Sequence, residues 1–204
     1  GSDFTASIFA ALLDAEEVVI WTDVDGVMSG DPRRIPDVAV IPELSWHEAM
    51  ELAYFGAKVL HPRTMAPLVA REIPVWIRNT AHPEGLGTRI GEVGEDGGVK
   101  GVTTIEGMAL LNLEGAGLIG VPGTASRLFE ALRGAGISVV LISQGSSEHS
   151  ICCAVPQADA LRARAAVAQA FAAEMRAGQG EGVELVHDCS ILAVVGEGMR
   201  GLPG

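Results

Sequence analysis

Short apolar runs alternate with stretches of helical periodicity in the first part of the chain. Two runs have the length and continuous hydrophobicity of buried strands, at residues 18–22 and 73–79. Three helices are predicted, at residues 4–14, 46–55 and 65–71. Ser45 and Glu48 form a capping box before the second helix, Gly56 ends it, and Thr64 is the predicted N-cap of the third. Strand, helix, helix and strand in this order predict an α/β domain with a parallel sheet.

A different pattern follows in the second part of the chain. Strands are predicted at residues 107–117, 136–144, 146–155 and 182–199, and helices at residues 122–133 and 159–176. Pro122 falls in the predicted first turn of its helix, where a missing N–H is tolerated. The order β-α-β-β-α-β predicts a ferredoxin-like module.

The segment between the two patterns, residues 80–100, is rich in glycine and charge, as linkers are. The predicted domains are residues 1–90, a linker at 91–106, a second domain at 107–187, and the truncated start of a further module at 188–204. The further module at 188–204 is predicted from an internal repeat, because "ILAVVGEGMRGLPG" is similar to "LLNLEGAGLIGVPG". We therefore expect the chain to be a fragment of a longer protein.

Composition narrows the possible functions. The net charge of -12 argues against a nucleic-acid partner and against an anionic membrane surface. No apolar run reaches the roughly 18 residues of a membrane-spanning helix. The three cysteines and five histidines show no metal-ligand spacing. These features indicate a cytoplasmic protein with reduced cysteines and no resident metal site.

Candidate chemistry lies first at the end of the strand at residues 18–22. Thr22 and Asp23 occupy the carboxyl end of a predicted parallel strand, which is where α/β proteins bind their ligands. A hydroxyl and a carboxylate there suit a ribose, a phosphate or hydrated Mg²⁺, although a turn rich in Asx hydrogen bonds explains them equally well. Arg33 and Lys58 supply positive charge that can stabilise a transferring phosphoryl group. Asp3 either caps a helix or orients a lysine or a substrate amine.

A second candidate site lies in the second module. Gly120, Val121, Pro122 and Gly123 are predicted at a helix N-terminus, where free N–H groups favour a carboxylate. Ser138 and Gln144 have even spacing, which places them on one face of one predicted strand. The alternative is that Pro122 only starts a helix and Gln144 fills a solvated strand end.

Several long motifs, in order, resemble the aspartate kinases of the amino-acid kinase family. "GSDF", "IWTDVDGVMSGDPR", "ELAYFGAKVLHP" and "IPVWIRNT" are similar to the C-terminal half of that catalytic domain. The segment from "LLNLEGAG" to "SICCAV" is similar to the first ACT regulatory module of the same family. The sequence of this segment most resembles the bifunctional and threonine-sensitive aspartokinases. The resemblance implies half of an amino-acid kinase α/β domain, then a ferredoxin-like ACT module and the start of a second.

The resemblance also implies site roles. The residues it implies as ATP contacts are Thr22, Asp23, Met28, Arg33, Lys58 and Val59. Lys58 would neutralise the phosphates during transfer, and Ser2 and Asp3 would lie near the aspartate substrate. Met28 stands where many relatives have a tyrosine. The implied effector contacts are Gly120, Val121, Pro122, Gly123, Ser138 and Gln144, with threonine favoured over lysine because of Gln144.

The implied reaction is ATP plus L-aspartate giving ADP and 4-phospho-L-aspartate, with Mg²⁺, in a homo-oligomer assembled through ACT modules. The family's N-terminal Lys-Phe-Gly-Gly segment is not in this sequence, so we expect the chain alone to be inactive. The alternative is a non-catalytic ACT-containing regulatory subunit that binds threonine or lysine. Such a subunit would not need "WTDVDGVMSGDPR" or "AKVLHP".

Overall fold

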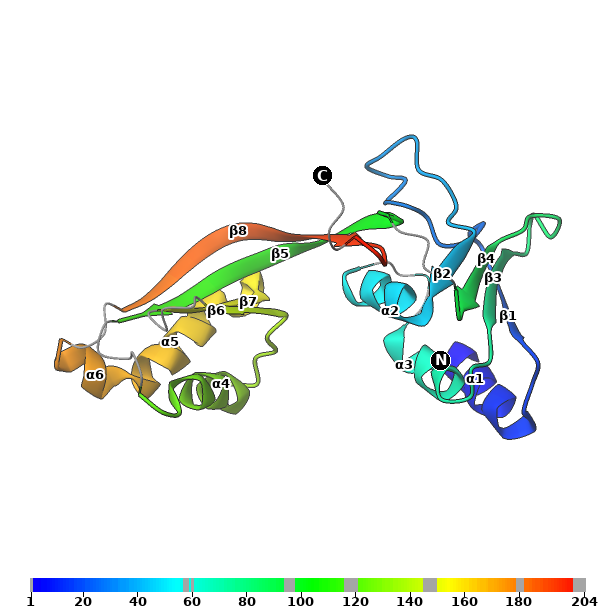
Figure 1. Cartoon of the computed structure of the whole chain (residues 1–204). Helices are drawn as coiled ribbons and strands as arrows, with labels where there is room; N and C mark the ends of the chain where they lie inside the picture. Colours follow the sequence, from blue (N-terminus) through cyan, green and yellow to red (C-terminus); the bar gives the residue numbers. More distant parts are fainter. Residues whose placement is uncertain are drawn as a thin grey trace. The chain divides into compact units, whose positions relative to one another are not determined.

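The computed structural model describes residues 2–56, 59, 61–93, 98–115, 121–144, 150–178 and 182–199 (Figure 1). The chain forms two compact units, one of Gly1–Thr104 with Leu192–Gly204 and one of Ile105–Ile191. Within the described residues, no helix combines the length and the apolar character needed to cross a bilayer.

The first unit is built on a four-stranded sheet. Its elements are α1 (Ser2–Leu13), β1 (Val18–Thr22), β2 (Glu43–Ser45), α2 (Trp46–Tyr54), α3 (Pro62–Val69), β3 (Val75–Asn79) and β4 (Thr88–Gly91). The strand order is β1-β3-β4-β2. β1 and β3 are parallel, as the sequence predicts, and so are β2 and β4, but β3 and β4 are antiparallel. The sheet is therefore mixed, because the antiparallel pairing of β3 with β4 joins its two parallel pairs.

Strand β4 corrects the prediction of a continuous linker at residues 80–100. Its Thr88 and Ile90 are fully buried, and Ile90 belongs to the core of the first unit. The Thr88 hydroxyl accepts a hydrogen bond from the Val27 N–H at 2.8 Å and donates one to the Ile41 carbonyl at 2.7 Å. The three residues between Gly87 and Gly91 are too few to show a strand period, so tertiary contacts establish this strand.

The capping box of α2 is confirmed. The Glu48 N–H donates to Ser45 Oγ at 3.1 Å, and the Ser45 N–H donates to a Glu48 carboxylate oxygen at 2.9 Å. The next helix starts earlier than predicted. His61, not Thr64, is the N-cap of α3, because Pro62 takes the first helical position and the His61 ring accepts the Arg63 N–H at 3.1 Å.

The second unit has the predicted ferredoxin-like order. The elements that form it are β5 (Gly101–Glu114), α4 (Thr124–Gly134), β6 (Leu141–Gln144), β7 (Ser150–Pro156), a 3₁₀ turn (Gln157–Asp159), α5 (Ala160–Ala170), α6 (Ala172–Arg176) and β8 (Gly182–Val195). Residues 101–104 of β5 and 192–195 of β8 belong to the first unit. The strand order is β6-β7-β5-β8. Figure 1 shows α4 and α5 on the same side of this sheet. Leu111, Leu113, Leu128, Leu132 and Phe171 are buried between these layers.

Element boundaries in this unit differ from the predictions in several places. β6 covers only the last four residues of the strand predicted at 136–144. Helix α4 begins at Thr124, two residues after Pro122. The buried Phe171 separates α5 from α6 within the predicted helix at 159–176. β5 begins at Gly101, inside the predicted linker at 91–106, and the predicted boundary between residues 187 and 188 falls inside β8.

Candidate functional site

The carboxyl ends of β1 and β3 meet at one edge of the first sheet. Thr22 is in register with Asn79 across this parallel pair, so the segments that follow the two strands leave the sheet side by side. The backbone N–H and the hydroxyl of Thr80 both donate to the Thr22 carbonyl, at 2.9 Å and 2.7 Å. The Thr22 hydroxyl in turn donates to the Asp23 carboxylate at 3.2 Å. The predicted pair Thr22 and Asp23 therefore lies at an edge suited to a ligand.

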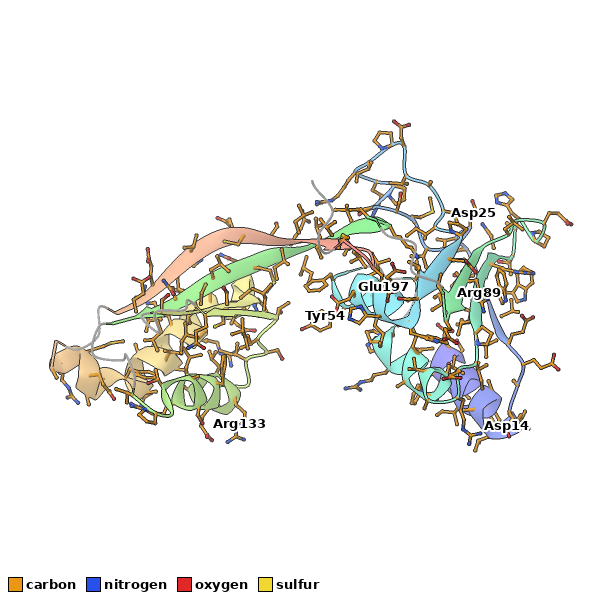
Figure 2. The ribbon with its side chains drawn as sticks, viewed as in Figure 1. Asp14, Asp25, Tyr54, Arg89, Arg133 and Glu197 are labelled. Atoms are coloured by element: carbon orange, nitrogen blue, oxygen red, sulfur yellow. The ribbon has the colours of Figure 1, made fainter. Side chains whose placement is uncertain are left out.

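A cluster of polar side chains joins the two segments just beyond this point. Asp25 Oδ1 accepts a hydrogen bond from Asn79 Nδ2 at 2.7 Å, and His82 Nδ1 lies 2.9 Å from the same oxygen. The Asn79 side-chain oxygen accepts the Ala81 N–H at 2.8 Å. The hydrogen bonds from His82 and then Asn79 hold the pKa of Asp25 below its usual range. Figure 2 labels Asp25 close to the end of this sheet.

The loop from Asp23 to Pro42 is folded back on itself. Met28 forms an antiparallel bridge with Val40, and the backbone of Val27 and Ser29 bonds that of Ile41 and Ala39, each at 2.8 Å. The loop is therefore a defined structure that positions the side chains it carries.

Arg33 extends from this loop into solvent. Its guanidinium binds both carboxylate oxygens of Asp31, at 3.0 Å and 2.9 Å, and its side chain is 78% exposed. The hydrogen bonds from Arg33 lower the pKa of Asp31. An anionic ligand at Arg33 would compete with Asp31 for the guanidinium, and the exposure of Arg33 leaves room for that ligand.

The other predicted kinase-site residues lie on separate elements. Ser2 and Asp3 are in the first turn of α1, where Ser2 Oγ donates to the Asp3 carboxylate at 3.1 Å. Val59 is half-buried against the core of the first unit. Lys58 lies outside the described residues.

The predicted effector residues of the second unit are partly described, and Gly120 lies outside the described residues. Gly123 is the N-cap of α4 with φ +89°, a left-handed conformation that favours glycine. Val121 and Pro122 precede it, both exposed. The prediction that Ser138 and Gln144 share one strand is wrong, since β6 begins at Leu141, although both side chains are exposed. The backbone from Ile137 to Val140 adopts no strand structure, so even spacing does not fix their faces.

Sequence reasoning assigned no role to Asp25, Asn79 or His82. In "IPVWIRNT" it recognised only a buried strand and a family motif. A signal for the polar end of this motif was available, because two predicted parallel strands that are neighbours must end at the same edge. That rule places Asn79 beside Thr22, whereas the hydrogen bond to Asp25 depends on the course of the loop.

Comparison with known proteins covers both units. The amino acid kinase family profile matches residues 1–79, and an ACT domain profile matches residues 111–171. The bifunctional aspartokinase/homoserine dehydrogenase 2 of Arabidopsis thaliana chloroplasts is 46% identical over 100% of the chain, and the bifunctional aspartokinase/homoserine dehydrogenase of Haemophilus influenzae is 48% identical over 100% of it. The chain spans only 23% and 25% of these two relatives.

Solved structures show the same similarity in three dimensions. Escherichia coli aspartokinase III in complex with aspartate and ADP superposes with a TM-score of 0.76 at 30% identity, over 96% of this chain and 43% of that one. The same enzyme in complex with lysine and aspartate gives a TM-score of 0.74 at 32% identity, over 96% of this chain and 43% of that one.

Proposed function

Because the chain belongs to the aspartokinase family, we propose that it is the nucleotide-binding half of a kinase domain with its regulatory ACT module. The parent enzyme would transfer a phosphoryl group from ATP to L-aspartate, giving ADP and 4-phospho-L-aspartate. This would be the first step of lysine, threonine and methionine biosynthesis. The observation that supports it most directly is the placement of Thr22 and Asp23 at the shared carboxyl edge of β1 and β3. The aspartate and ADP complex of the E. coli neighbour supports the same substrates.

We propose a role for each of the residues at this site. Thr22, Asp23, Met28, Arg33, Lys58 and Val59 bind ATP, Ser2 and Asp3 lie by L-aspartate, and Lys58 and Asp3 take part in the transfer. The exposed guanidinium of Arg33 supports a role in binding anionic phosphates. The exposed carboxylate of Asp23 is the kind of oxygen group that hydrated Mg²⁺ prefers, and Mg²⁺ bound with ATP would neutralise phosphate charge.

We also propose four segments along the chain. They are the kinase part at residues 1–90, a linker at 91–106, the ACT module at 107–187 and the start of a second module at 188–204. The ferredoxin-like strand order β6-β7-β5-β8 supports the ACT module.

Regulation would come from a feedback amino acid at that ACT module, threonine or lysine. The proposed contacts are Gly120, Val121, Pro122, Gly123, Ser138 and Gln144. The complex of the E. coli neighbour with lysine supports lysine as one of the two candidate effectors. Exposed Ile142 on β6 and Val186 on β8 support assembly through this module into a homo-oligomer. We place the protein in the cytoplasm, although the plant relatives are named chloroplastic.

The test is an assay of aspartate-dependent ADP release by the full-length protein. Wild type should be active, and Lys58→Ala should lower kcat by about 10²-fold or more, since it removes a cation from the transferring phosphoryl group. Arg164→Ala, an exposed basic position on α5, is the matched control and should leave kcat unchanged. The chain by itself should release no ADP. A full-length protein without this activity would instead favour the non-catalytic regulatory subunit.

A further inference from the structure

We propose that Asn79 is a positioning residue for nucleotide binding, which acts by holding Asp25 at the start of the loop from Asp23 to Pro42. The inference rests on the proposed function, because that loop carries the residues assigned to ATP. Asn79 itself would not touch the nucleotide.

Asn79 is a buried polar side chain that uses both ends of its amide. It is 7% exposed, its Nδ2 donates to Asp25 at 2.7 Å, and its side-chain oxygen accepts the Ala81 N–H at 2.8 Å. A buried amide costs free energy unless both of its ends find partners. These two bonds connect the segment after β1 with the segment after β3. The side chain therefore joins two pieces of chain that are 54 positions apart.

Asp25 occupies a corner of the loop where the chain direction changes. Gly26 follows with φ +151°, and a Cβ on it would lie 2.5 Å from the Thr88 hydroxyl of β4. The Val27 N–H then donates to that same hydroxyl at 2.8 Å. Before the corner, the chain is held by the hydrogen bond from the Thr80 hydroxyl to the Thr22 carbonyl. After the corner, it is held by the hydrogen bond from the Val27 N–H to the Thr88 hydroxyl. Asn79 supplies the fixed point at the corner itself.

His82 makes the second contact to Asp25, from a more exposed position. Its side chain is 69% exposed, while that of Asp25 is 53% exposed. A contact so open to water is screened and contributes little to holding the corner. The part-buried bond from Asn79, whose side chain is itself buried, is therefore the one on which the geometry of the loop depends.

Loss of this contact should act on nucleotide affinity more than on turnover. If the loop has the binding-competent geometry only part of the time, apparent affinity falls by that fraction. Once ATP is bound, the reacting groups are unchanged. We expect KM for ATP to rise about tenfold, with kcat and KM for aspartate changed less than about threefold.

The experiment uses the full-length protein with Asn79→Asp, Asp25→Asn and the double exchange. Asn79→Asp sets two carboxylates against each other and should raise KM for ATP and the Kd for ATP measured by calorimetry about tenfold. Asp25→Asn keeps an acceptor for Asn79 and His82 and should stay within about threefold of wild type. The double variant regenerates the pair with donor and acceptor reversed, while the carboxylate introduced at position 79 still accepts the Ala81 N–H. It should restore ATP affinity to within about threefold.

Gln157→Glu, an amide-to-acid change at a half-buried position of the second unit, is the control and should leave ATP affinity unchanged. The inference is overturned if Asn79→Asp lowers thermal stability without changing ATP affinity, or if it raises KM for ATP and KM for aspartate equally. It is also overturned if adding Asp25→Asn does not restore the ATP affinity of Asn79→Asp. A wild-type protein that binds ATP but does not phosphorylate aspartate would defeat the proposed function. The Kd values for ATP would still judge the role of Asn79.

Discussion

The carboxylate of Glu48 is buried and accepts the Lys100 ammonium at 3.0 Å, joining the first turn of α2 to the residue just before β5. The same carboxylate accepts the Ser45 N–H at 2.9 Å and the Glu197 N–H at 2.8 Å. The Ser45 hydroxyl closes the network by donating to the Glu197 carboxylate at 2.7 Å. Figure 2 labels Glu197 beside α2. The chain entering β5 and the chain leaving β8 are thus tied to one helix N-terminus within the first unit.

Replacing Glu48 by glutamine should destabilise the first unit by about 2 kcal/mol. The Glu48 side chain is only 1% exposed, and both of its oxygens accept N–H groups. A glutamine must turn its NH₂ toward one set of these donors, which leaves buried donors unpaired. Tryptophan fluorescence during urea unfolding can measure the effect, because all three tryptophans, at positions 21, 46 and 76, lie in the first unit.

The matched control is Glu43→Gln. The Glu43 side chain is 51% exposed and lies 3.4 Å from Arg89, so its loss should change stability by less than about 0.5 kcal/mol. Equal effects at the two positions would contradict the structural importance of the Glu48 network.

The stability of the first unit should also depend on pH through Glu48. Burial raises the pKa of this carboxyl, but the N–H groups of Ser45 and Glu197 and the Lys100 ammonium lower it more, so its pKa falls below the ordinary 4.5. A lowered pKa contributes stability that is present above pH 4.5 and is lost as the pH falls through the folded-state value.

The difference in unfolding free energy between wild type and Glu48→Gln should therefore be largest at neutral pH and shrink below pH 4.5. Urea unfolding of both proteins across pH 3 to 7 checks this. A difference that stays constant over this range would mean that the charge of Glu48 does not contribute.

Cys153 should be the least reactive of the three cysteines. It is fully buried, and burial raises its pKa to about 11, whereas Cys152 and Cys189 are half-buried. Since the thiolate is the reactive form, alkylation at pH 8 should modify Cys153 only after unfolding. Peptide mass spectrometry over time gives the order of modification. Early modification of Cys153 in the folded protein would contradict its buried position in β7.

Gln144→Ala in the full-length protein should weaken binding of the feedback amino acid and relieve inhibition. Gln144 is exposed at the end of β6, opposite Ile151 of β7, so its amide is open to a ligand. Calorimetry with threonine and with lysine gives the affinities, and loss of one amide contact should weaken binding about tenfold. Gln169→Ala, on α5, serves as control. Unchanged binding and inhibition in Gln144→Ala would remove this residue from the effector site.

The sequence by itself determined the elements whose signals are local. The apolar runs at β1 and β3, the capping box of Ser45 and Glu48, and the β-α-β-β-α-β order all follow from residues within a few positions of each other. Caps and hydrophobic periodicity act over one or two turns, so they can be read without the fold. The position of Thr22 and Asp23 at a sheet edge follows from the same signals.

Only the tertiary structure decided which distant residues meet. The pairing of β4 with β3, the bond from Asn79 to Asp25 and the network around Glu48 join positions far apart in the chain. None of these contacts has a local pattern, because a buried hydrogen bond forms wherever packing brings a donor and an acceptor together. Burial also decided that Glu48 does more than cap a helix, since a carboxylate withdrawn from water must find every partner within the protein.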